Sequence, residues 1–231
     1  MRSRTTAARK QPRTLVLGND ASWGGWGWCL ADQHGPLQVG HLALGPPRRR
    51  ASKTKANPYP KLLATHRLQR FKQYLHGPLA LVLADAQLLR RPSDPLVRVV
   101  VEVPPLGFKS GKASAYVAVG RMVGAIEVWG CRPSLATPWV QEPGEWRGYW
   151  RIPPSGRGRG SAQLKADAIT LATSLWGRKW LEPFNRTAKG GPRGDVAEAM
   201  LLTVRSCRDQ TGAPETPTTW PGVPAGLEFG P

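Results

Sequence analysis

Acidic residues are scarce in this chain. Its 231 residues include 15 Asp and Glu against 33 Lys and Arg, a formal net charge of +18. Residues 33–84 contain no acidic residue at all. A solvated surface normally mixes both signs, so this balance excludes an ordinary neutral surface and is typical of a protein that binds a polyanion, usually nucleic acid. A basic surface of the thermophilic or ribosome-associated kind is the alternative.

Cysteine, clustered histidine and long apolar runs are also scarce. The three cysteines, Cys29, Cys131 and Cys207, lie far apart and form no Cys-x-x-Cys pair, which excludes a zinc motif or a disulfide framework. The four histidines do not cluster in the sequence, and we interpret them as incidental. No apolar run approaches the roughly 18 residues of a membrane helix. We therefore expect a reduced, cytoplasmic protein with no membrane partner.

What is present is a pattern of short apolar strands followed by alternating strands and helices. Strands are predicted at 14–19, 26–31, 37–44, 96–103 and 132–140, and helices at 61–75, 79–89, 113–129, 161–176 and 194–205. The first three strands predict an antiparallel meander, and the alternation that follows predicts an α/β fold, a mixed sheet with helices on both faces. We expect a basic flexible arm at 1–13, one domain at 14–208 and a Pro/Thr/Gly-rich flexible tail at 209–231. Residues 144–160, rich in Trp, Arg and Gly, are predicted to form a loop.

Four of the few carboxylates stand at strand ends or a helix start. Asp20 closes the first strand and Glu102 closes the Val-rich strand LVRVVVEV. Asp195 and Glu198 are three residues apart and share one helix face. Three of them have a simpler interpretation: Asp195 and Glu198 form a capping box, and Asp20 is a turn acid. Glu102 is harder to explain so, because an unpaired carboxylate in a buried strand is costly.

Carboxylates grouped without His or Cys favour a hard cation such as Mg²⁺ or Mn²⁺. Two such ions about 4 Å apart suit phosphodiester hydrolysis. In a basic chain, the pattern predicts a phosphodiesterase that acts on nucleic acid.

Four segments, in order, resemble the RuvC-type Holliday junction resolvases of the ribonuclease H-like superfamily. They are LVLGNDASWGGWGWCLAD, VVVEVPPLGFKSGKASAYVAVGRMVGAIEVWG, GRGRGSAQLKADAITLATSLWG and GDVAEAMLLTVRSC. The resemblance implies a ribonuclease H-like mixed five-stranded sheet and a homodimer that resolves four-way junctions by paired symmetric nicks, with two Mg²⁺ or Mn²⁺ ions per active site. The long basic insertions favour a bacteriophage member, in the cytoplasm of a bacterial or phage-infected cell.

The resemblance also implies roles for individual residues. Asp20, Glu102 and Asp195 correspond to metal ligands, and Glu198 to a fourth ligand that is usually Asp. Lys165 corresponds to a catalytic lysine near the scissile phosphate. The family often places an aromatic wedge three residues after the catalytic Glu; here that residue is Pro105, and the nearest aromatic is Phe108. The helix at 113–129, with its small residues, is the expected dimer surface.

The remaining candidates are basic or aromatic and are expected to contact DNA. They are Arg48, Arg49, Arg50, Lys53, Lys55, Phe108, Lys109, Lys112, Arg147, Arg151, Arg157, Arg159 and Lys165. Trp146 and Trp150 either stack on unpaired bases or pack in the core. Two alternatives to junction cleavage stay open: a related nuclease acting on forks, flaps or RNA–DNA hybrids, and a non-catalytic nucleic-acid-binding protein on the same fold.

Overall fold

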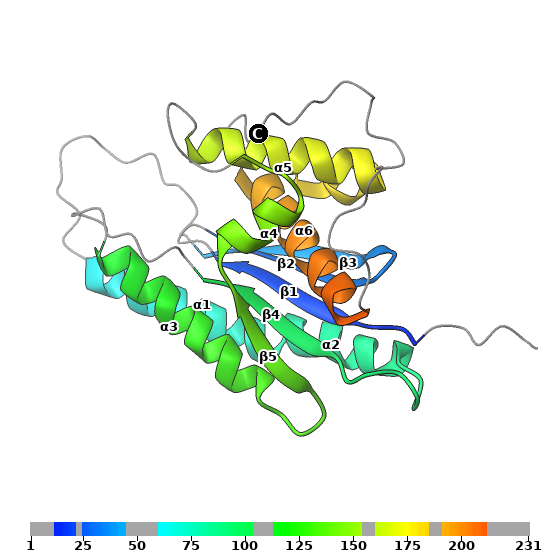
Figure 1. Cartoon of the computed structure of the whole chain (residues 1–231). Coiled ribbons are helices and arrows are strands. Elements are labelled where there is room, and N and C mark those ends of the chain that lie inside the picture. The colour runs from blue at the N-terminus through cyan, green and yellow to red at the C-terminus, as the bar shows by residue number, and fades with distance from the viewer. Residues whose placement is uncertain are drawn as a thin grey trace, which may run out of the picture.

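A five-stranded mixed sheet organises the computed structural model, which describes residues 12–21, 25–44, 60–103, 113–153, 160–184 and 191–211 (Figure 1). The strands are β1 (Val16–Ala21), β2 (Gly25–Asp32), β3 (Gly35–Ala43), β4 (Arg98–Glu102) and β5 (Ala136–Gln141). Their order across the sheet is β3-β2-β1-β4-β5. β1, β2 and β3 are antiparallel, whereas β4 runs parallel to both β1 and β5. The predicted fold class, an α/β mixed five-stranded sheet that begins with an antiparallel meander, is confirmed.

Helices cover both faces of the sheet, as predicted (Figure 1). One face is covered by α1 (Pro60–His76), α2 (Pro78–Leu89) and α3 (Ala113–Gly130). The other is covered by α4 (Pro143–Tyr149), α5 (Ser161–Trp176) and α6 (Gly191–Thr211), with two short 3₁₀ helices, η1 (Arg178–Trp180) and η2 (Glu182–Phe184), between α5 and α6. No helix in the described ranges has the length and apolar composition of a membrane span.

Strict alternation along the central strands divides the core into two layers. Leu15 and Leu17 belong to the layer under α1, α2 and α3, while Val16 between them belongs to the layer under α6. In β4, likewise, Val99 and Val101 face the first layer and Val100 the second. Because successive strand residues point to opposite faces, Asp20 and Glu102 lie on the α6 side.

Small residues on the α6 side of β1 and β2 let that helix lie close to the sheet. A Cβ at Gly18 would overlap the side chain of Thr203, and a Cβ at Gly27 would overlap the backbone carbonyl of Asp195. Both partners belong to α6, so these glycines are needed for close approach rather than for unusual backbone angles. The start of α6 therefore lies directly over the end of β1 at which Asp20 stands.

The end of the sheet opposite Asp20 is held by an ion-pair network around Arg13. The Arg13 backbone N–H donates to Asp94 (3.0 Å), and its guanidinium donates to Asp32 (2.9 Å). Arg91 donates to Asp94 through both its backbone and its side chain. The chain that precedes β1 is thus anchored at the end of the sheet where β1, its central strand, begins.

The predicted loop at 144–160 is wrong in part, because Pro143–Tyr149 form α4. Pro143 resembles a strand breaker but occupies the first turn of a helix, where its missing N–H costs nothing and its fixed φ is favourable. α6 also extends from Gly191 to Thr211, beyond the predicted 194–205, and Arg208 and Asp209 are helical. The predicted arm at 1–13 and tail at 209–231 lie largely outside the described residues.

Candidate metal centre

The sheet places Asp20 and Glu102 side by side. β1 and β4 pair in parallel through Asn19↔Val101, and Asp20 and Glu102 are the next residue on each strand. Asp20 lies within β1, so it is not the turn acid of the simpler interpretation. Both side chains are buried. Two carboxylates at one end of neighbouring strands, on the same face, form half of the expected ligand set.

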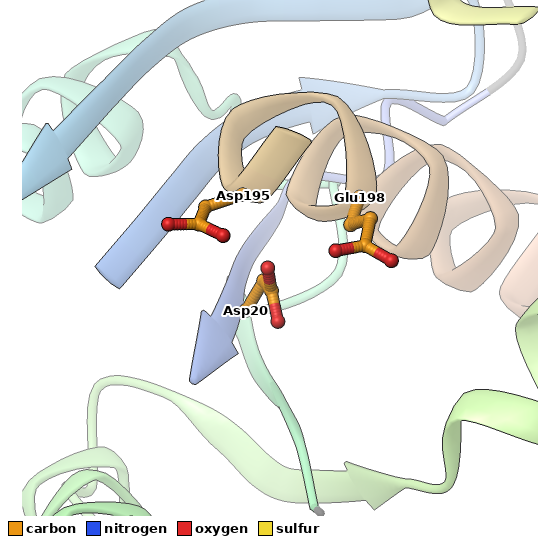
Figure 2. A group of neighbouring side chains, drawn as sticks. All are labelled: Asp20, Asp195 and Glu198. Atoms are coloured by element: carbon orange, nitrogen blue, oxygen red, sulfur yellow. The ribbon is translucent and has the colours of Figure 1, made fainter. Parts of the chain in front are cut away.

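α6 supplies the other half. Its first residue is Gly191, so Asp195 and Glu198 lie inside the helix and do not form a capping box at its start. Both are buried, at 5% and 3% exposure. Figure 2 shows their carboxylates pointing toward that of Asp20 at the end of β1. One carboxylate oxygen from each of Asp20, Asp195 and Glu198 lies within 4.8 Å of the other two.

Asp20 differs from the other acids in its hydrogen bonding. Its Oδ2 is buried and has no hydrogen-bond partner among the described residues. A buried carboxylate oxygen without a donor is costly. Asp20 is therefore the acid whose environment most requires a cation that the protein itself does not supply.

Glu102 lies outside this close group of three, but its charge contributes to the raised pKa of Asp20. Its Oε2 accepts a hydrogen bond of 2.6 Å from the indole N–H of Trp146, on α4. Trp146 and Trp150 are 0% and 1% exposed, so the structure shows them packed in the core and contradicts base stacking. Trp150 donates its own N–H to the carbonyl of Leu201 on α6, at 2.8 Å.

Two basic side chains reach the acids from the same face. Lys165 on α5 pairs with Asp195 and lies 3.9 Å from Glu198. A Cβ at Gly194 would meet the Lys165 side chain at 2.7 Å, so this glycine leaves room for the lysine. Arg147 on α4 donates to Glu198 at 2.7 Å, with its side chain 19% exposed. Arg147, which the sequence predicts to contact DNA, thus forms an ion pair with Glu198 in the structure.

His41 belongs to this cluster and was missed by the sequence interpretation. Its Nε2 lies 3.2 Å from Oδ2 of Asp195. The sheet register explains the contact: Asp20 pairs with Gly27 on β2, and Gly27 pairs with His41 on β3. Because paired residues share a face of the sheet, His41 points to the same side as Asp20. The available signal was that His41 lies within a predicted strand. Only the pairing of β3 with β2 shows which face of the sheet its side chain is on.

Burial and mutual repulsion raise the pKa of several of these acids. Burial, followed by the charges of Glu102, Glu198 and Asp195, raises the pKa of Asp20 well above its ordinary value, against Lys165. Burial and Glu198 raise the pKa of Glu102 to about 7, although Arg147, Trp146 and Lys165 oppose the shift. Burial also raises the pKa of Glu198, against Arg147 and Lys165. Without added positive charge, the cluster therefore favours bound protons.

Lys165 responds in the opposite way. Burial alone would lower the pKa of its ammonium, but the carboxylates of Asp195, Asp20 and Glu198 raise it above the ordinary value. Lys165 is thus held as a cation beside the acids at any pH near neutrality.

The residues present fit a hard divalent cation. The close group offers only carboxylate oxygens, which Mg²⁺ and Mn²⁺ prefer. Its three oxygens lie close enough to share one ion, and the unpartnered Oδ2 of Asp20 is one carboxylate oxygen left to face it. Glu102, beside Asp20 in the sheet, adds a carboxylate to the same rim.

The other predicted DNA contacts lie mainly outside the described residues. Arg151 is described and exposed, with a left-handed backbone φ of 54°. The residues that fall outside are Arg48, Arg49, Arg50, Lys53, Lys55, Pro105, Phe108, Lys109, Lys112, Arg157 and Arg159.

Comparisons with known proteins give likeness in structure only. No family model and no curated protein sequence matches the chain. Among solved structures, the chain is similar to RuvC of Thermus thermophilus, with a TM-score of 0.48 and 13% identity over 87% of this chain and 98% of that one. The same protein in complex with a Holliday junction substrate gives 0.46 and 13% over 86% and 97%. The yeast mitochondrial Holliday junction resolvase Ydc2 gives 0.45 and 14% over 88% and 82%.

Proposed function

We propose that this chain is a metal-dependent endonuclease that resolves four-way DNA junctions by paired symmetric nicks. The observation that carries the proposal is the convergence of buried carboxylates from β1, β4 and α6 around an oxygen of Asp20 that has no hydrogen-bond partner among the described residues. Such a centre in a chain of net charge +18 combines an affinity for phosphate with a site for the cations that hydrolyse it.

The acids would hold the metal, with Asp20 as the central ligand and Glu102, Asp195 and Glu198 around it. Divalent ions bound there would lower the pKa of the attacking water and neutralise the negative charge that develops on the leaving 3′-oxygen. Lys165 keeps its ammonium charged between Asp195 and Glu198, where it would neutralise charge on an incoming phosphate. The depth of the acids limits the solvent around the reacting phosphate, which strengthens each of these charge interactions.

The choice of a four-way junction rests on the four ordered segments that resemble RuvC-type resolvases. Symmetric nicking also requires two active sites, hence a homodimer. α3 is the surface proposed for the dimer, because it exposes Val117 and Val128 at 53% and 77%. Sedimentation of the wild type beside Val128→Arg tests this: we expect a dimer that the variant dissociates, and a wild-type monomer would contradict paired nicking.

A substrate panel with a matched acid control tests the function. Junction, fork, flap, RNA–DNA hybrid and duplex substrates are incubated with Mg²⁺ or Mn²⁺ and wild type, Asp20→Asn or Asp85→Asn. Asp85 is exposed on α2, away from the cluster. We expect junction nicking by wild type and Asp85→Asn only, with junction binding retained by Asp20→Asn.

Other outcomes separate the alternatives. Preferential cleavage of forks, flaps or hybrids would reassign the substrate while keeping the metal centre. Binding without cleavage of any substrate, together with no uptake of Mn²⁺, would favour a non-catalytic nucleic-acid-binding protein. Persistent nicking by Asp20→Asn would place the active site elsewhere.

A further inference from the structure

The short helix α4 connects the two elements that carry Glu102 and Glu198. Glu102 pairs with Gln141 at the end of β5, and α4 begins two residues later at Pro143. At its other end, Trp150 is tied to Leu201 of α6 by an indole hydrogen bond. α4 is therefore anchored to both sides of the acid cluster.

Two consecutive residues of α4 contact two different acids. Trp146 donates to Glu102 on β4, and Arg147 donates to Glu198 on α6. The Arg147 guanidinium also lies 4.8 Å from the centre of the Trp146 ring. Trp146 is wholly buried, so its ring is held by packing and its N–H direction is fixed.

From this arrangement we propose that Trp146 is a positioning residue, which orients the Glu102 carboxylate toward the metal. The bond occupies Oε2 and leaves the other oxygen, Oε1, outside this contact. A single donor on one oxygen fixes the rotation of the carboxylate and leaves the second oxygen for ligation.

The chemistry of the donor supports this role. Glu102 needs a partner because it is buried beside other carboxylates. A lysine or arginine would satisfy it, but it would add a third positive charge to those of Lys165 and Arg147 and so oppose a divalent cation further. The indole N–H is a neutral donor that cannot be deprotonated at ordinary pH or act as an acceptor, so it orients Glu102 without competing with the metal.

The test compares two buried indole donors that have different acceptors, a metal-facing carboxylate and a backbone carbonyl. Trp146→Phe removes the donor to Glu102, and Trp150→Phe removes a donor of similar burial to a backbone carbonyl of α6. Both variants lose a buried hydrogen bond, so both should lower the melting temperature. Binding of Mn²⁺ to the full chain is measured by titration calorimetry. We expect a loss of affinity of about tenfold or more for Trp146→Phe and a change below about twofold for Trp150→Phe.

A double-mutant cycle and an isosteric replacement keep the result interpretable. In a Glu102→Gln background, Trp146→Phe should cause no further loss of Mn²⁺ affinity, because the carboxylate it orients is gone. Replacing Trp146 by benzothienylalanine, which keeps the ring shape but lacks the N–H, should reproduce the loss without a cavity. Equal Mn²⁺ affinities of the Trp146 and Trp150 variants would overturn the proposal.

The inference rests on the proposed metal centre, and the two can fail separately. If wild type binds Mn²⁺ no better than Asp20→Asn, the proposed function fails. If wild type binds and Asp20→Asn does not, while Trp146→Phe binds as wild type does, only the role of Trp146 fails.

Discussion

Asp20 is the acid of the cluster whose burial is least compensated by hydrogen bonds within the described part of the chain. Its carboxylate is buried with three others nearby, and its Oδ2 has no donor in the described part of the chain. The other acids are each relieved by a neighbour: Trp146 for Glu102, Lys165 for Asp195 and Arg147 for Glu198. Asp20 therefore carries a cost in the metal-free fold that only a bound cation or a proton removes.

Removing the charge of Asp20 should accordingly stabilise the metal-free protein. We expect Asp20→Asn to melt higher than wild type in the presence of a chelator, because the like-charge repulsion is gone; about 1 kcal/mol shifts the melting temperature of a chain this size by about 2–4 °C. Differential scanning calorimetry measures the shift, with Asp85→Asn as the control. Added Mn²⁺ should raise the melting temperature of wild type but not of Asp20→Asn, and a destabilised variant would contradict this account.

His41 should contribute to metal affinity through Asp195. With its proton on Nε2, His41 donates to Oδ2 of Asp195 and fixes the carboxylate. We expect His41→Leu to weaken Mn²⁺ binding roughly tenfold, measured by calorimetry. His41→Gln, which retains an N–H donor, should recover part of the loss. Equal affinities of the Leu variant and wild type would make the contact incidental.

At the residue scale, the clustering of the acids could be predicted from sequence but their hydrogen-bond partners could not. Asp20 and Glu102 each close an apolar strand, a pattern visible along the chain. His41 and Trp146 reach the acids only through pairing between distant segments: β3 with β2 for His41, and β5 with β4 for Trp146. Register is set by turns and packing that a single sequence does not display.

At the scale of elements, α6 determines the geometry of the site because it packs closely against glycines of β1 and β2. Gly18 and Gly27 lie where any Cβ would overlap α6. This places Asp195 over Asp20, so the spacing between sheet and helix also sets the spacing between the clustered carboxylates. Most strands and helices were predicted within a few residues of their observed ends; α4 was not, because Pro143 was interpreted as a breaker.

Enlarging Gly27 should separate α6 from β2. A Cβ there would overlap the backbone carbonyl of Asp195, and backbone cannot move aside as a flexible side chain does. We expect Gly27→Ala to lower the free energy of unfolding by about 1–3 kcal/mol and to weaken Mn²⁺ binding, as measured by urea denaturation and calorimetry. Gly144→Ala, at an exposed position with open space around it, is the control and should leave both values nearly unchanged.

For the whole molecule, stability without metal should depend on pH with the sign set by the acids. The pKa of Glu102 is raised to about 7 from an ordinary 4.5. A group with a raised folded pKa contributes stability that is fully present below its unfolded pKa and is lost as pH rises through the folded one. We expect the metal-free melting temperature to fall between about pH 4.5 and 7.

A variant and an added cation check this pH dependence. Glu102→Gln should flatten the fall, and saturating Mn²⁺ should reverse it, since a bound cation favours the ionised acids. Asp94, whose pKa is lowered to about 2 by the Arg91 backbone hydrogen bond, titrates below this range. A metal-free melting temperature that rises from pH 5 to 8 would contradict the raised pKa values.

The basic N-terminal residues should contribute to binding through phosphate contacts. Residues 1–11 hold Arg2, Arg4, Arg9 and Lys10 and no acid. Deleting them, with Arg13 kept so that its ion pairs stay intact, should flatten the dependence of log K on log salt by up to about 0.9 per lost contact. Junction binding measured from 50 to 300 mM salt (roughly the range over which such slopes are resolved) tests this, and an unchanged slope would exclude these residues from the DNA contact.

The anchoring of Arg13 fixes the distance between the start of the described chain and the acid cluster. Arg13 is fixed by Asp32 and Asp94 at one end of β1, and Asp20 stands at the other. At about 3.3 Å per residue, the seven residue steps from Arg13 to Asp20 separate the two by roughly 23 Å. Along a duplex, with about 3.4 Å between successive base pairs, that length corresponds to about seven base pairs. In the proposed function, the residues before Arg13 therefore begin about seven base pairs from the cleaved phosphate.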